Sequence, residues 1–123
     1  NPTNISIDGT LEAAVKSFVI PHPTKTGKKL KYGVLEGPEH AVYYRGKTTG
    51  SIIELPEEWT GLVDEETITV QLTSIGSHQN LYVNEIKNNS IFIKNKNIFS
   101  SKINAYYLVH GTRKDINPLE TTV

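Results

Sequence analysis

The sequence predicts an all-β fold, an antiparallel β-sandwich of about eight short strands with at most one helical turn. Short runs of β-branched and aromatic residues recur along the 123-residue chain, and turn-forming glycine, proline or asparagine residues separate them. The clearest run is 67–73, in which Ile68, Val70 and Leu72 alternate with threonine and glutamine. Such strict alternation is typical of an antiparallel strand with one buried face.

The composition limits the classes of function. Thirteen Lys and Arg residues balance thirteen Asp and Glu residues, so no net field attracts nucleic acid or an anionic membrane surface. The sequence contains no cysteine, which excludes disulfides, thiolate metal sites and a cysteine nucleophile. It also lacks methionine and begins with Asn1, and we therefore expect a processed product or the C-terminal part of a longer protein.

The first third of the chain predicts a connector and two strands. The polar N-terminal segment indicates a connector or short edge strand that ends in a turn at Asp8-Gly9. The chain is predicted to be extended from about Val15 to Ile20 and again over 30–35. A loop separates these strands, because its two prolines cannot donate to a strand ladder. The predicted domain limits are a connector at 1–10, a single β-sandwich domain at 11–119 and a tail at 120–123.

A sharp corner is predicted between two strands, in the chemically most varied stretch of the sequence. Gly37-Pro38 indicates a turn, because proline fixes φ and glycine tolerates unusual backbone angles. The strand 41–47 follows. Glu36 and Glu39 are predicted to accept backbone N–H groups at this corner and to pair with Arg45. The corner is therefore interpreted as a rigid, charge-paired structural element.

The remaining two thirds of the chain predict one helical turn and the other strands. Pro56 and the two carboxylates after it favour a helical turn, with Trp59 folded back onto the core. Asn88-Asn89 predicts a hairpin turn, because asparagine tolerates positive φ. The longest strand is apolar on both sides, so it is either central in a sheet or faces another subunit through Tyr106 and Leu108. The predicted strands are 52–55, 67–73, 81–86, 90–94 and 103–113, with a solvated loop at 64–66.

Some polar residues are candidates for catalysis or metal binding. Glu36 and Glu39 would form a pair of carboxylates for acid–base chemistry. Nothing supplies a nucleophile or an obvious pocket, however, which favours their structural interpretation. No spacing of glycines matches a phosphate-binding loop. The four histidines have no compact ligand spacing, although a three-histidine zinc site could assemble in space; they are His22, His40, His78 and His110.

Aromatic and basic residues supply the candidate binding surface. Tyr43, Tyr44 and Trp59 carry rings with a polar atom, which suit contacts with sugars or proteins. A basic loop could contact phosphate or an anionic sugar. Buried aromatic rings and solvated lysines are the structural alternatives. The basic loop contains Lys25, Lys28, Lys29 and Lys31, of which Lys28 and Lys29 are the binding candidates.

Several stretches, taken in this order, resemble one family. They are 17–24 (SFVIPHPT), 35–46 with LEGPE and VYYRG, 53–64 with IELPEEW and GLVD, 72–83 with LTSIGSHQ and LYV, and the ending 107–115 (YLVHGTRKD). From about Leu11 to Leu119 the chain resembles the C-terminal β-rich domain of fibre-like and other virion structural proteins of tailed bacteriophages, notably phages of marine cyanobacteria.

This resemblance implies an assembly role without a cofactor. The chain would be a non-enzymatic virion structural module, the terminal domain of a homotrimeric tail or head fibre, with residues 1–10 as the end of its shaft. Its partners would be copies of itself, other virion proteins and a host surface glycan, with no nucleic acid and no membrane. The family offers no catalytic or metal-binding residues. The alternatives are a glycan-binding receptor tip, a capsid decoration protein and a glycoside hydrolase that uses Glu36 and Glu39.

Overall fold

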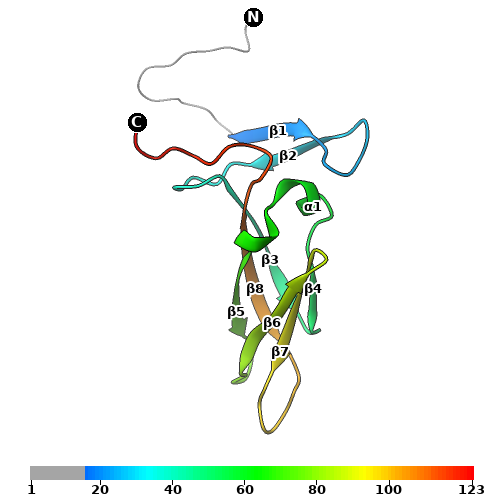
Figure 1. Ribbon diagram of the computed structural model, residues 1–123. Coiled ribbons are helices and arrows are strands. Elements are labelled where there is room, and N and C mark those ends of the chain that lie inside the picture. Colours follow the sequence, from blue (N-terminus) through cyan, green and yellow to red (C-terminus); the bar gives the residue numbers. More distant parts are fainter. Residues whose placement is uncertain (1–15) are drawn as a thin grey trace, which may run out of the picture.

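Eight strands, one α-helical turn and one 3-10 turn make up the fold within residues 16–123, which are the residues that the computed structural model describes (Figure 1). All strand pairs are antiparallel, which confirms the predicted all-β class. None of the helices in this range has the length and apolar character needed to cross a bilayer. The elements are β1 (Ser17–Pro21), β2 (Lys29–Gly33), β3 (Ala41–Thr48), β4 (Ile52–Glu54), α1 (Trp59–Leu62), the 3-10 turn η1 (Glu65–Thr67), β5 (Thr69–Ser74), β6 (Leu81–Lys87), β7 (Ser90–Asn95) and β8 (Ala105–Thr112).

The strands form two three-stranded sheets and a two-stranded ribbon. One sheet has the order β3-β8-β5 and the other the order β4-β7-β6, while β1 and β2 pair with each other. The strand β8 is therefore central in its sheet, as its two apolar sides predicted. Figure 1 shows the two sheets along the length of the molecule and the β1–β2 ribbon across one end.

The hydrophobic core joins both sheets. Successive side chains of a strand point to opposite faces of a sheet, and the buried residues of the two central strands follow this alternation. On β7 these residues are Ile91 and Ile93, and on β8 they are Ala105 and Val109. The largest fully buried side chains are Trp59, Leu62, Ile91, Ile93 and Val109.

The β1–β2 ribbon closes one end of this core. Leu30 is buried, and Phe18 and Tyr32 pack against the core with their ring centroids 5.7 Å apart. The guanidinium of Arg113 lies 3.8 Å from the centre of the Phe18 ring. It also donates to both carboxylate oxygens of Asp115, at 2.9 and 2.7 Å. The segment that follows β8 is thereby fixed against the ribbon.

The β6–β7 hairpin is confirmed together with its asparagine turn. Asn88 and Asn89 have φ of 51° and 57°, the left-handed backbone that the favoured two-residue hairpin turns require. A bulge interrupts the β6–β7 ladder between Val83 and Glu85. This bulge lies on an edge strand, since β6 ends the order β4-β7-β6.

One local prediction in the middle of the chain is confirmed and another is corrected. The predicted helical turn follows Pro56 and its two carboxylates, as α1 from Trp59. Residues 64–66 are exposed, as predicted, but a 3-10 turn replaces the predicted loop, because the Asp64 carboxylate accepts the N–H of Glu66 at 3.2 Å. The hydroxyl of Thr67 donates to the Asp64 carbonyl at 2.6 Å. The strand β5 therefore starts at Thr69, later than predicted.

The structure describes the C-terminal end of the chain but not the predicted N-terminal connector. The connector at 1–10 and its Asp8-Gly9 turn lie outside the described residues. At the other end, residues 117–123 are exposed and belong to no helix or strand.

Gly111→Ala tests how closely β8 is packed. A Cβ atom at Gly111 would lie 2.4 Å from Cγ1 of Val63, and overpacking a core costs roughly 1–3 kcal/mol. We expect this variant to lower the free energy of unfolding by about that amount in urea denaturation. Gly33→Ala is the matched control, because a Cβ atom there would meet nothing within 4 Å. Equal losses in the two variants would contradict this packing.

Candidate functional site

The predicted corner exists, but its charge partners differ from the prediction. A bend at Gly37–Glu39 leads into β3. Glu36 accepts from Lys16, with Nζ and Oε1 2.5 Å apart, and Glu39 accepts from the Thr112 hydroxyl at 2.9 Å. The predicted pairing of these carboxylates with Arg45 is wrong, and so are the predicted backbone N–H donors, since the partners found within residues 16–123 are these side chains.

The geometry of this corner gives Glu36 a structural role. The hydrogen bond from Lys16, together with the lysine charge, lowers the pKa of the Glu36 carboxyl. A general acid needs the opposite shift, because it must hold its proton near neutral pH. Glu36 is therefore an ion-pair partner that joins the segment before β1 to the segment after β2.

Two of the predicted binding residues line a cleft beside the corner. The cleft has a volume of about 790 Å³ and lies between β3 and the end of β2. Tyr43 is 50% exposed, and Tyr44 is half-buried. The polar and aromatic side chains of the lining are Lys31, Tyr32, Tyr43, Tyr44, Arg45 and Glu58.

Trp59 lies in the core behind this cleft and cannot contact a ligand at the surface. Its side chain is buried, with an exposed fraction of 1%, so its assignment as a binding residue is wrong. The indole Nε1 donates to the Tyr32 hydroxyl at 3.2 Å, and that hydroxyl donates to Glu58 at 2.9 Å. Trp59 therefore fixes the orientation of a tyrosine that lines the cleft.

The predicted lysine pair lies apart from the cleft. Lys28 precedes β2 and Lys29 begins it, and neither residue lines the cleft. Lys31 does line it. The sequence places Lys31 in the basic loop, but Lys31 was not among the predicted binding residues. The alternation of side chains along β2 could have identified it, because Leu30 and Tyr32 point to the core and Lys31 therefore points to the opposite face.

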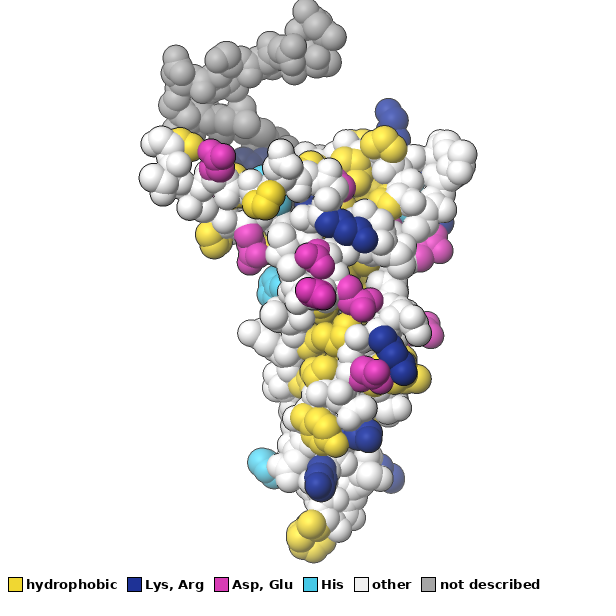
Figure 2. All heavy atoms as spheres, viewed as in Figure 1, with side chains coloured by type: hydrophobic (Ala, Val, Ile, Leu, Met, Phe, Trp, Pro, Cys, Tyr) yellow, Lys and Arg dark blue, Asp and Glu magenta, His cyan; other side chains and the backbone are white. Residues whose placement is uncertain are grey.

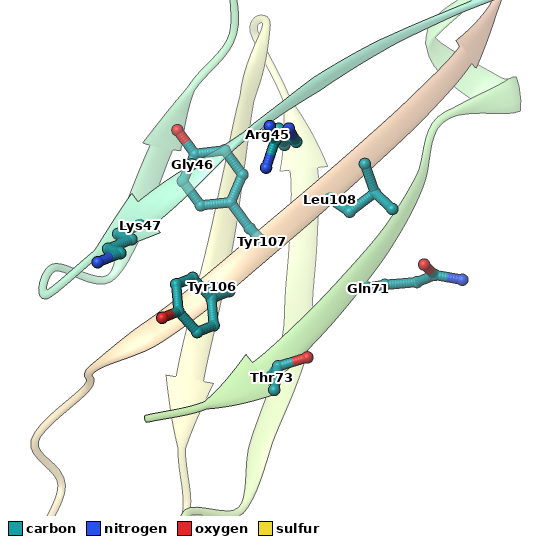
Figure 3. Close-up of a pocket in the computed structure, with 8 residues that line it drawn as sticks. All are labelled: Arg45, Gly46, Lys47, Gln71, Thr73, Tyr106, Tyr107 and Leu108. Carbon is teal, nitrogen blue, oxygen red and sulfur yellow. The ribbon is translucent and has the colours of Figure 1, made fainter. Parts of the chain in front are cut away.

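A second candidate surface is the outer face of the β3-β8-β5 sheet, called the outer face below. The strand register aligns three rows across it, which are Tyr43–His110–Thr69, Arg45–Leu108–Gln71 and Lys47–Tyr106–Thr73. Figure 3 shows Tyr106 between Lys47 and Thr73, and Leu108 between Arg45 and Gln71. The last two rows border a groove of about 520 Å³.

The outer face combines aromatic rings with positive charge. Tyr106 is 46% exposed, and the Lys47 ammonium lies 5.2 Å from the centre of its ring. The Tyr43 and His110 ring centroids are 6.5 Å apart. The three described rows contain two cations, Arg45 and Lys47, and no carboxylate. A face of this composition suits contact with another macromolecule that carries acidic groups.

The histidines lie apart in the fold. Within residues 16–123, no three His, Cys, Asp or Glu side chains group closely enough to hold a metal ion. His22 accepts the backbone N–H groups of Thr24 and Lys25 at its Nδ1, at 3.2 and 3.1 Å. His110 belongs to the outer face.

Comparisons of the chain with protein-family models, with curated proteins and with solved structures gave no match. The cleft, the outer face and the resemblance seen in the sequence are therefore the basis for the function proposed below.

The Tyr32 network predicts a specific dependence of stability on pH. Burial, followed by the hydrogen bond to Glu58, raises the pKa of Tyr32 from 10.0 to about 12. The folded protein then keeps a proton that the unfolded chain loses, so this contribution to stability is complete below the unfolded pKa and is lost as pH rises through the folded pKa. We expect the stability advantage of the unmodified protein over Tyr32→Phe to shrink across this window in urea denaturation.

A stability difference between the unmodified protein and Tyr32→Phe that stays constant across this window would contradict the raised pKa.

Proposed function

We propose that the chain is a non-enzymatic structural module of a virion, the terminal domain of a homotrimeric tail or head fibre of a tailed bacteriophage. The family resemblance supports the class of protein. The outer face supports the assembly role, because it offers a contact surface on a rigid sheet.

The outer face is the single observation that carries this proposal. Tyr106 and Leu108 lie at its centre on β8, the strand with partners on both sides. Tyr106 and Arg45 are exposed and Leu108 is partly buried; tyrosine and arginine beside an apolar residue on one surface are typical of subunit contacts. Free in water, this face would leave the Tyr106 ring exposed.

The charge of the outer face favours a ring of subunits over a two-fold dimer. In a two-fold dimer the same patch meets itself, which would bring Arg45 and Lys47 of one copy near the same cations of the other. In a three-fold ring each patch meets a different surface of its neighbour. An exposed acidic run is available for this purpose at Asp64, Glu65 and Glu66.

Light scattering tests the assembly. We expect a mass of about three times the 13.7 kDa of one chain. Tyr106→Glu should give monomers, because it places a carboxylate at the centre of the contact and desolvates it there. Tyr82→Glu is the matched control, since Tyr82 is similarly exposed but lies on β6. A concentration-independent monomer for the unmodified protein would remove the trimer from the proposal.

The cleft favours a second function, the binding of a host surface glycan. It is concave, and tyrosine rings line it together with cations from two different elements, β2 and β3. Sugars stack their apolar faces on aromatic rings while side-chain polar groups bind their hydroxyls. This function is compatible with a fibre domain, because the cleft lies beside the outer face.

A glycan array tests the cleft. We expect binding by the unmodified protein and a loss of roughly tenfold or more in affinity for Tyr43→Ala, because truncating an aromatic anchor costs over 1 kcal/mol. Tyr82→Ala, which removes a comparably exposed ring from β6, should bind normally. An array without hits would count against a glycan partner.

A further inference from the structure

The end of the molecule opposite the β1–β2 ribbon exposes two adjacent apolar side chains. This end, called the tip below, is the loop 96–104 between β7 and β8, at the bottom of Figure 1. Ile98 and Phe99 are each 91% exposed. Figure 2 shows a hydrophobic group at the extreme end of the molecule. Neither side chain contributes to the core.

Polar contacts hold the tip in shape without covering these side chains. Asn95 donates through Nδ2 to the carbonyl of Lys102 at 2.6 Å. Asn97 accepts the N–H of Phe99 at 2.9 Å and donates to the carbonyl of His78 at 3.2 Å. The loop backbone is therefore fixed by side-chain amides. Ile98 and Phe99 remain presented to the solvent in a defined conformation.

The tip is also locally basic, although the chain is neutral overall. Lys94, Lys96 and Lys102 belong to it or border it, and the sequence contains no Asp or Glu from Ile86 to Lys114. The carboxylate just before this stretch, Glu85, lies 3.3 Å from the ammonium of Lys87. In the view of Figure 2 basic side chains, and no acidic ones, lie next to the apolar end. The tip is therefore basic, in a chain that has no net charge.

We propose that the tip docks on a lipid bilayer with anionic headgroups. Ile98 and Phe99 enter the boundary between headgroups and acyl chains, and the neighbouring lysines contact headgroup phosphates. Apolar side chains next to lysines match the chemistry of this boundary, where burial and attraction to anionic lipid add together. The expected absence of a membrane partner rested on the net charge, which does not reveal a locally basic tip.

The side chains favour a bilayer over a protein partner. Protein contacts are enriched in arginine and depleted in lysine, and their anchors fill pockets on the partner. Here the cations are lysines, and the apolar pair projects from a narrow loop. Two apolar side chains that project in this way can be buried by lipid molecules that rearrange around them, without a preformed pocket. The proposal does not depend on the fibre function or on trimer formation.

A fluorescent variant reports insertion directly. Phe99→Trp keeps an aromatic ring at the tip, and the single native tryptophan, Trp59, is buried away from it. We expect the emission to shift to shorter wavelength on addition of vesicles that contain equal amounts of phosphatidylglycerol and phosphatidylcholine. Vesicles of phosphatidylcholine alone should cause little shift. No shift with either vesicle, or equal shifts with both, would overturn the proposal.

Paired variants separate the apolar and charged contributions in vesicle co-sedimentation. Ile98→Ser/Phe99→Ser should weaken binding to the anionic vesicles at least about tenfold, because two apolar side chains lose their burial. Val19→Ser is its control, since Val19 is a half-exposed apolar residue of the ribbon. Unchanged binding by the double variant would overturn the proposal.

Lys94→Gln/Lys96→Gln should weaken binding roughly tenfold or more, since each lysine near an anionic surface contributes about a fivefold increase in affinity. Lys28→Gln/Lys29→Gln removes the same charge at the ribbon end and should bind normally. Equal losses in the two double variants would show that net charge, and not the tip, directs binding, and this would overturn the proposal. A monomer in light scattering would leave all these expectations intact.

Discussion

The buried indole N–H of Trp59 is the constraint that organises the ribbon end of the molecule. A buried donor without a partner costs about as much as a lost hydrogen bond or more, and the Tyr32 hydroxyl supplies that partner. Tyr32 belongs to β2, while Trp59 begins α1, so one hydrogen bond joins the ribbon to the sandwich. Glu58 completes the network by accepting from Tyr32. The wall of the cleft therefore depends on a contact made in the core.

The fold distributes its chemistry over three separate places. The cleft lies where the ribbon meets β3, the outer face covers β3, β8 and β5, and the tip lies at the far end of the sandwich. The two sheets bury their apolar residues between them, which leaves the opposite faces and the loops free to differ in charge and polarity. A neutral total charge consequently conceals a basic tip, since no Asp or Glu occurs from Ile86 to Lys114.

The sequence predicted the elements well and their mutual arrangement poorly. Asn88-Asn89 located a hairpin turn because few residues accept its backbone angles, and the two apolar sides of β8 indicated a central strand. The partners of Glu36 and Glu39 could not be predicted, since Lys16 and Thr112 come from distant segments that only the folded chain brings close. The outward orientation of Arg45 could have been predicted, because side chains alternate along β3 and Val42, three residues earlier, is buried. Trp59 was correctly expected in the core, and its second assignment as a surface contact was incompatible with that position.

The bulge in β6 limits how copies of this chain can associate. An edge strand normally exposes a continuous row of N–H and C=O groups that a neighbouring chain can extend. Between Val83 and Glu85 that row is interrupted, and the kink twists the edge away from a straight incoming strand. Growth of an endless shared sheet along this edge is therefore disfavoured, and side-chain surfaces remain as the route to an assembly of finite size.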